Sequence, residues 1–147
     1  MIPQLAKRNK KSALMFLSSF IGSMVSPGMS VYSGTKAFIR YFSQGVGYEH
    51  SLVPNEREID FLVYDAGRVA TKLLGKEKVG GAVLSPDEAC KKSLRDLGLE
   101  TQTSGSKIHE QNYYERNHLW PAEKYKKFIY SKAIENYKRI EKEKKSQ

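Results

Sequence analysis

The sequence is poor in the residues that build disulfide frameworks and metal centres. It contains a single cysteine, Cys90, and three histidines among 147 residues. One cysteine excludes an internal disulfide, and no partner histidine or acid stands at ligand spacing from it. We therefore expect no metal site, and we expect Cys90 to pack as a small apolar side chain.

Long apolar segments are also missing. Residues 12–35 carry no charge, but they include seven serines and the pair Pro27-Gly28, and their strongly apolar run covers only 13–17. A membrane-spanning helix needs about 20 predominantly apolar residues, so this segment does not predict one. The first twelve residues show no cleavage pattern, and we expect no signal peptide.

Negative charge is scarce, because 25 Lys and Arg stand against 16 Asp and Glu, for a net charge of +9. The excess lies at the two ends, with four basic residues in 7–11 and a net charge of +5 in 121–147. Basic ends can contact an acidic membrane surface or nucleic acid, although such runs are most often solvated helix faces. We expect no nucleic-acid partner.

An apolar strand followed by a helix organises the first half of the chain. Residues 13–17 are five apolar residues between polar flanks, which favours a parallel strand covered on both faces. Residues 31–50 show an apolar stripe every four residues, which predicts a helix. Further along the chain, residues 59–64 predict a second strand, and residues 85–88 predict a helix start with a capping box. Residues 101–109 predict a polar turn into a short last strand.

Three polar residues occur where the first strand and the following helix meet. Ser19 ends the strand, and Tyr32 and Lys36 are four residues apart, so they share one face of the predicted helix. A tyrosine normally loses its proton only near pH ~10, and a nearby ammonium favours the phenolate. A serine hydroxyl can stabilise negative charge that develops on the same substrate oxygen. The trio suits proton transfer to or from an alcohol or carbonyl. The alternative is a strand and a helix with a Tyr–Lys pair on the surface.

The sequence contains a serine, twelve further residues and then Tyr-x-x-x-Lys, all after a predicted apolar strand. This pattern resembles the short-chain dehydrogenase/reductase family. The resemblance implies that Ser19, Tyr32 and Lys36 are catalytic: Tyr32 donates the proton, Lys36 adjusts its acidity and Ser19 holds the carbonyl oxygen. It also implies NADP(H) or NAD(H) as the cofactor, with Tyr32 and Lys36 among its contacts.

A second family motif, Pro-Gly-x-Val-x-Thr, follows the next strand. In this sequence Gly67, Val69 and Thr71 match it, and Ala66 stands where the proline is usual. The resemblance implies that these three residues bind the cofactor, with the Val69 backbone and the Thr71 hydroxyl holding the nicotinamide carboxamide. Taken alone, the segment is a loop in which Thr71 could cap a helix.

The resemblance is to the C-terminal half of the family. It implies an α/β fold, the C-terminal half of a Rossmann-type doubly wound parallel sheet with about three strands, and a long C-terminal helix. Residues 1–112 would form a partial dehydrogenase domain, and 113–147 a basic amphipathic helical extension. The glycine-rich turn that holds the cofactor pyrophosphate in the family is missing, so we expect the chain to be inactive alone. The missing N-terminal half fits three explanations: a truncated gene model, a splice form or a degenerate copy.

Residues 85–109 are similar to a narrower branch, the very-long-chain 3-oxoacyl-CoA reductases and related 17-beta-hydroxysteroid dehydrogenases. This similarity implies hydride transfer on a lipid-like or steroid ketone or alcohol. The family resemblance also implies a homodimer through helix 31–50, and the C-terminal helix could contact a membrane surface. The end Lys144-Lys145-Ser146-Gln147 resembles a dilysine signal, which favours association with the endoplasmic-reticulum membrane over a cytoplasmic location. The alternative function is a non-catalytic docking module of the same fold.

Overall fold

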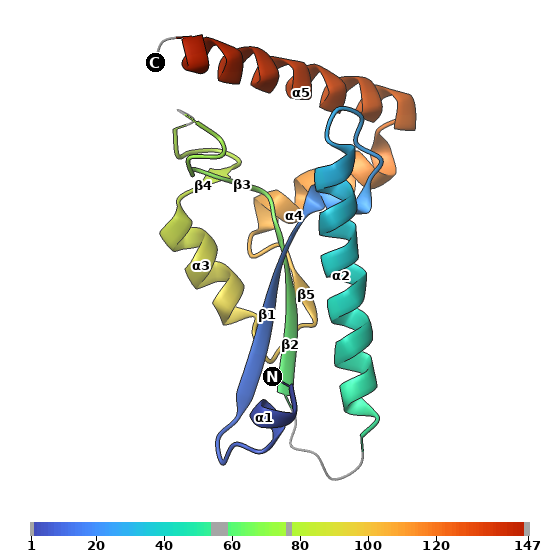
Figure 1. The fold of residues 1–147 in the computed structure, drawn as a ribbon, viewed down its shortest axis with the longest axis vertical. Helices are drawn as coiled ribbons and strands as arrows, with labels where there is room; N and C mark the ends of the chain where they lie inside the picture. The colour runs from blue at the N-terminus through green and yellow to red at the C-terminus, as the bar shows by residue number, and fades with distance from the viewer. Residues whose placement is uncertain (1, 54–58, 76–77, 146–147) are drawn as a thin grey trace.

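A three-stranded parallel sheet lies at the centre of the computed structural model, which describes residues 2–53, 59–75 and 78–145 (Figure 1). The strand order is β1-β2-β5, where β1 is Ser12–Ser19, β2 is Ile59–Ala66 and β5 is Gln102–Thr103. The predicted α/β fold with three parallel strands and a long C-terminal helix is confirmed. The other elements are α1 (Ile2–Ala6), the 3₁₀-helix η1 (Phe20–Ser23), α2 (Ser30–Ser51), β3 (Arg68–Val69), β4 (Val83–Leu84), α3 (Pro86–Arg95), α4 (Lys107–Tyr114), the π-helix η2 (Glu115–Leu119) and α5 (Ala122–Lys145).

The central strand β2 is buried, whereas β1 is only half covered. Leu62 and Val63 of β2 are 0% and 2% exposed, because β2 pairs with a strand on each side. In β1, Met15 is 37% exposed and Leu17 is 57% exposed. The prediction that residues 13–17 are covered on both faces is therefore wrong. Helices α2 and α3 lie on opposite sides of the sheet (Figure 1). The buried cluster around Ala89 of α3 centres on β2 and leaves β1 open on that side.

Helix α3 begins at the capping box that the sequence predicts. The Ser85 hydroxyl accepts a hydrogen bond from the Glu88 backbone N–H at 3.2 Å, and the Glu88 carboxylate accepts one from the Ser85 backbone N–H at 3.2 Å. Ala89 is buried on the inner face of the helix. Cys90, by contrast, is exposed, so the expectation that it packs as a buried apolar residue is wrong. Its side chain borders an open cavity between α3 and the sheet.

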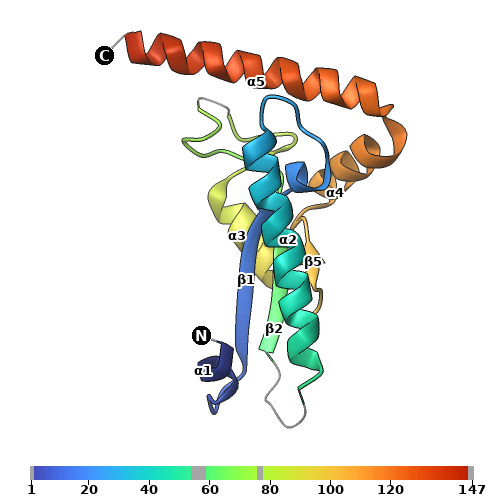
Figure 2. The same cartoon turned by 45° about the vertical axis from the view of Figure 1, so that its right-hand side comes forward.

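Helix α5 lies across the end of the molecule toward which the strands point (Figures 1 and 2). It packs on the loops that follow β1 and β3: the Tyr125 hydroxyl is 3.4 Å from the Ser26 hydroxyl, and Arg139 donates to the Leu74 carbonyl at 2.9 Å. In the part of the chain that is described, no helix is both long and apolar enough to cross a membrane.

Two predictions from the sequence concern the C-terminal part of the chain. A short strand is present as β5, but the predicted order of a polar turn leading into a strand over 101–109 is wrong: the strand comes first, and helix α4, which contains His109, begins at Lys107. Of the tail that resembles a dilysine signal, Ser146 and Gln147 lie outside the described residues.

Candidate active site

The site begins where β1 and β2 end side by side. Their parallel register pairs Ser19 with Ala66, so the serine stands beside the start of the predicted cofactor motif. The Ser19 hydroxyl donates to the Ala66 carbonyl at 3.1 Å. In parallel sheets, ligands bind outside the carboxyl ends of the strands. This register places Ser19 at such an end.

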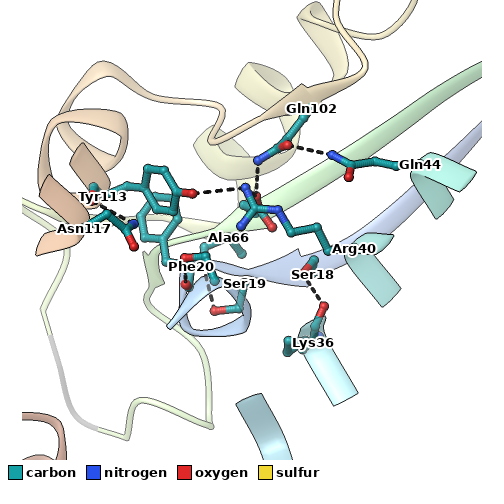
Figure 3. Close-up of polar contacts among 12 residues, drawn as sticks. Ser18, Ser19, Phe20, Lys36, Arg40, Gln44, Ala66, Gln102, Tyr113 and Asn117 are labelled. Atoms are coloured by element: carbon teal, nitrogen blue, oxygen red, sulfur yellow. Dashed lines mark hydrogen bonds and ion pairs between the residues drawn. The ribbon is translucent and has the colours of Figure 1, made fainter. Parts of the chain in front are cut away.

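Helix α2 brings Tyr32 and Lys36 to the same strand end. The Lys36 ammonium donates to the Leu17 carbonyl at 2.9 Å and lies 5.7 Å from the centroid of the Tyr32 ring. The Ser18 hydroxyl in turn donates to the Lys36 carbonyl at 2.9 Å. These bonds tie this turn of the helix to the end of β1, and Figure 3 shows the contact between Ser18 and Lys36.

One cavity of about 570 Å³ is bordered by every residue that the sequence predicts for the site. They are Ser19, Tyr32, Lys36, Gly67, Val69 and Thr71. Much of the remaining wall is apolar and includes Leu17, Leu73 and Leu74. The structure thus brings the six residues together from β1, α2 and the segment after β2, while their catalytic and binding roles stay a prediction.

The cavity fits the nicotinamide end of a dinucleotide. An aromatic ring needs apolar walls, and its carboxamide needs paired donors and acceptors. Leu17 and Leu74 supply apolar surface, and Val69 and Thr71 also line the cavity. Among the described residues, the Lys36 ammonium donates to the Leu17 carbonyl. An ammonium carries three N–H donors, so it can also donate to a ligand.

Gly67 is required for close packing against a buried histidine. A Cβ atom at this position would lie 2.6–2.7 Å from the His109 ring, closer than any side chain tolerates. His109 is 1% exposed, and its Nε2 atom is 3.0 Å from the Ala82 carbonyl. The sequence patterns did not indicate that His109 lies against the predicted cofactor motif, because 42 residues separate it from Gly67.

A buried polar network next to the site also escaped sequence analysis. The Arg40 guanidinium lies 3.1 Å from the Asp65 carboxylate, and their side chains are 9% and 3% exposed. Gln102 donates to the same carboxylate at 2.6 Å, and Arg40 donates to the Tyr113 hydroxyl at 3.2 Å. Gln44 extends the network by donating to Gln102 at 2.8 Å (Figure 3).

The network has electrostatic consequences at Asp65. Burial raises the pKa of the Asp65 carboxyl above its ordinary value, and the Arg40 charge and neighbouring hydrogen bonds offset only part of this increase. Arg40 lies one helical turn after Lys36, and Asp65 directly precedes Ala66. The ion pair therefore fastens the Tyr32–Lys36 face of α2 to the end of β2.

Comparison with known proteins relates the chain to reductases. It is 30% identical to the very-long-chain 3-oxoacyl-CoA reductase of Mus musculus over 137 residues, which is 92% of this chain and 42% of that protein. It is 30% identical to the Homo sapiens protein of the same name over 108 residues, covering 74% of this chain and 33% of that one. For the Podospora anserina protein of this name, identity is 29% over 99 residues, covering 67% and 28% of the two chains.

The fold has a close counterpart among solved structures. A structure described in a study of 7beta-hydroxysteroid dehydrogenase stereoselectivity matches with a TM-score of 0.66 and 22% identity, covering 80% of this chain and 47% of the other. No family model matches the sequence. The chain thus spans less than half the length of these curated relatives and of this structural counterpart.

Proposed function

The chain belongs to the short-chain dehydrogenase/reductase family, and on this premise we propose that it forms the proton-transfer side of an NAD(P)H-dependent oxidoreductase. The reaction is hydride transfer between a nicotinamide cofactor and a ketone or alcohol. The observation that carries the proposal is the single cavity bordered by Ser19, Tyr32 and Lys36 together with the motif from Gly67 to Thr71.

Each residue of the trio has a task that its surroundings permit. Tyr32 is 39% exposed and borders the cavity, so its phenol can give a proton to a carbonyl oxygen there. Lys36 lies beside the Tyr32 ring, and in this proposal its ammonium assists Tyr32 and contacts the cofactor. The Ser19 hydroxyl turns from the Ala66 carbonyl to the substrate oxygen and stabilises its developing charge. When bound, the cofactor supplies the hydride.

The role of Tyr32 is tested by replacing its phenol in an active protein. The chain is substituted for the segment of the mouse reductase that it matches, and turnover of a 3-oxoacyl-CoA is measured with NADPH. Tyr32→Phe is expected to lower kcat by about 10²–10⁴-fold, the usual contribution of a general acid. Tyr41→Phe is the matched control, because Tyr41 lies on the same helix with 68% of its surface exposed. Near-normal turnover of the Tyr32→Phe protein would refute the proposal.

We propose that the 147-residue chain by itself binds NADPH weakly and does not turn over. The cavity suits the nicotinamide end, but the sequence contains no glycine-rich turn between a strand and a helix to hold the pyrophosphate. Titration calorimetry of the chain with NADPH checks this directly. Micromolar or tighter binding would contradict it.

The substrate class follows from the names of the relatives. We propose a 3-oxoacyl-CoA first, since three reductases of that name match by sequence, and a steroid ketone second, from the structural counterpart. NADPH is preferred over NADH in this proposal, with the endoplasmic-reticulum membrane as the location and the basic face of α5 toward its surface. Comparing kcat/KM for the two substrates and the two cofactors in the chimeric reductase distinguishes the options.

A specific observation favours a docking function as the second candidate, including a homodimer through α2. Phe38, Tyr41 and Phe42 of this helix are 67%, 68% and 50% exposed, and aromatic side chains of this kind are enriched at protein interfaces. Sedimentation of the chain is expected to reveal dimers that Phe38→Glu abolishes and Lys138→Glu, on exposed α5 surface, retains. A monomer at all concentrations would exclude the dimer.

A further inference from the structure

Two consecutive serines end strand β1, and their hydroxyls have different partners (Figure 3). Ser19 borders the reaction cavity and donates to the Ala66 carbonyl at 3.1 Å. Ser18 is 1% exposed and donates to the Lys36 carbonyl of α2 at 2.9 Å. Successive residues of a strand point to opposite faces of the sheet. Adjacent hydroxyls can therefore serve separate purposes.

Lys36 is tied to β1 through its backbone and through its side chain. Its carbonyl accepts the Ser18 hydroxyl, and its ammonium donates to the Leu17 carbonyl at 2.9 Å. The two bonds run in opposite directions and end on adjacent strand residues. A shift of Lys36 along or around the helix axis would stretch at least one of them. Together they fix the ammonium 5.7 Å from the centroid of the Tyr32 ring.

The 3₁₀-helix η1 supports the same turn of α2. Gly22 of η1 is buried, and a Cβ atom added there would lie 2.8 Å from both the Lys36 carbonyl carbon and the Ala37 nitrogen. This separation is shorter than any side chain tolerates, so only a glycine lets η1 lie against the helix backbone here. The peptide group between Lys36 and Ala37 is thus contacted by η1 as well as by Ser18.

The buried carboxylate of Asp65 competes for the Ser18 proton. Asp65 stands beside Ser18 in the parallel register. Burial raises the pKa of the Asp65 carboxyl, and the Arg40 charge and hydrogen bonds that include one with Ser18 offset part of this rise. A serine hydroxyl has only one proton to donate. Arg40 and Gln102 hold the carboxylate at 3.1 and 2.6 Å. Asp65 therefore competes less strongly, and the Ser18 proton stays on the Lys36 carbonyl.

We propose that Ser18 is a positioning residue for the reaction, whose hydroxyl fixes the Lys36 backbone so that the Lys36 ammonium stays beside Tyr32. Because Ser18 is buried, it acts through Lys36 rather than on the substrate or the cofactor. The inference rests on the proposed function and deepens it by giving the two neighbouring serines different tasks. Ser19 acts on the substrate oxygen, and Ser18 acts on the helix that carries Tyr32 and Lys36.

Nuclear magnetic resonance of the 147-residue chain tests the positioning without any need for activity. Ser18→Ala is expected to shift the amide resonances of Lys36 and Ala37, because it removes a hydrogen bond to the peptide group between them. Ser43→Ala is the matched control: Ser43 is also 1% exposed, but its hydroxyl donates to carbonyls within its own helix α2. Shifts at Lys36 and Ala37 no larger than those in Ser43→Ala would overturn the proposal.

A double-mutant cycle in the chimeric reductase tests the consequence for turnover, at a temperature at which circular dichroism shows every variant folded. Ser18→Ala is expected to lower kcat about 10-fold with little change in KM, since a misplacement of about 1 Å can cost about 10²-fold in rate. In a Lys36→Met background, the same substitution should change kcat less than about twofold, because effects transmitted through one residue are not additive. Ser18→Thr, which keeps the hydroxyl, and the control Ser43→Ala should both retain most of kcat.

Tyr32→Phe in the same chimera separates this inference from the proposed function. Loss of turnover in Tyr32→Phe together with equal kcat in Ser18→Ala and Ser43→Ala would sink the inference and leave the proposed function standing. An equal loss from Ser18→Ala with and without the Lys36 ammonium would show a merely structural role and would likewise refute it. Near-normal turnover of Tyr32→Phe would instead remove the proposed function, and the inference with it.

Discussion

Breaking the Arg40–Asp65 ion pair is expected to destabilise the chain strongly. Arg40→Met keeps most of the apolar stem but removes the charge 3.1 Å from the Asp65 carboxylate. Because both side chains are nearly buried, the carboxylate left behind loses its ion-pair partner and stays shielded from water. Removing one partner of a buried pair costs about 3–5 kcal/mol, a large part of the roughly 5–15 kcal/mol that holds a typical domain together.

The pH dependence of this loss has a definite sign. Burial already raises the pKa of Asp65 in the folded chain, and removal of Arg40 raises it further. A carboxyl whose folded pKa lies above its unfolded value of about 3.9 binds more protons when folded. It therefore contributes stability below the unfolded value, and this contribution is lost as the pH rises through the folded pKa. The deficit of Arg40→Met should be largest near neutral pH and smaller near pH ~4.

Urea unfolding followed by far-ultraviolet circular dichroism measures the effect at each pH. The double variant Arg40→Met/Asp65→Asn is expected to recover most of the stability, because the amide oxygen of asparagine still accepts the Gln102 hydrogen bond without a charge. Lys11→Met is the exposed counterpart: Lys11 pairs with Asp60 at 3.0 Å, but its side chain is 66% exposed, so the loss should stay below about 1 kcal/mol. A loss of less than about 1 kcal/mol for Arg40→Met, or one independent of pH, would refute the reasoning.

Two further predictions concern local structure, and the same unfolding assay checks both. Ser85→Ala is expected to cost about 1 kcal/mol by removing the cap on the Glu88 N–H, whereas Ser85→Asp should retain most of it; equal losses for the two would speak against the cap. Gly67→Ala is expected to cost about 1–3 kcal/mol, because the added Cβ meets the His109 ring. In Gly45→Ala, the Cβ added in the interior of α2 meets no atom within 4 Å, so this substitution should instead stabilise the chain by up to about 1 kcal/mol. Similar destabilisation by both alanines would rule out the close contact at Gly67.

Local patterns predicted the elements that lie around the site. The four-residue repeat over 31–50 matches α2, Ser30–Ser51, within a residue at each end. The Ser-Pro-Asp-Glu run matches the observed cap of α3. These signals act over a few residues, through side-chain spacing and hydrogen bonds to neighbouring backbone, so a single sequence contains them in full.

Exposure and long-range polar contacts could not be predicted in this way. Residues 13–17 are apolar enough for a fully covered strand, but β1 lies at the edge of the sheet with one face partly open. Arg40, Asp65, Gln102 and Tyr113 come from four elements, and no spacing rule relates them.

The sequence by itself determined helices α2 and α3, strands β1 and β2, and the spacing of Ser19, Tyr32 and Lys36, because periodicity and capping depend on neighbours along the chain. The tertiary structure alone decided which charges are buried, which glycine touches a histidine ring and which side chains share a cavity. Those properties depend on how layers from distant parts of the chain pack, and on how much water that packing excludes.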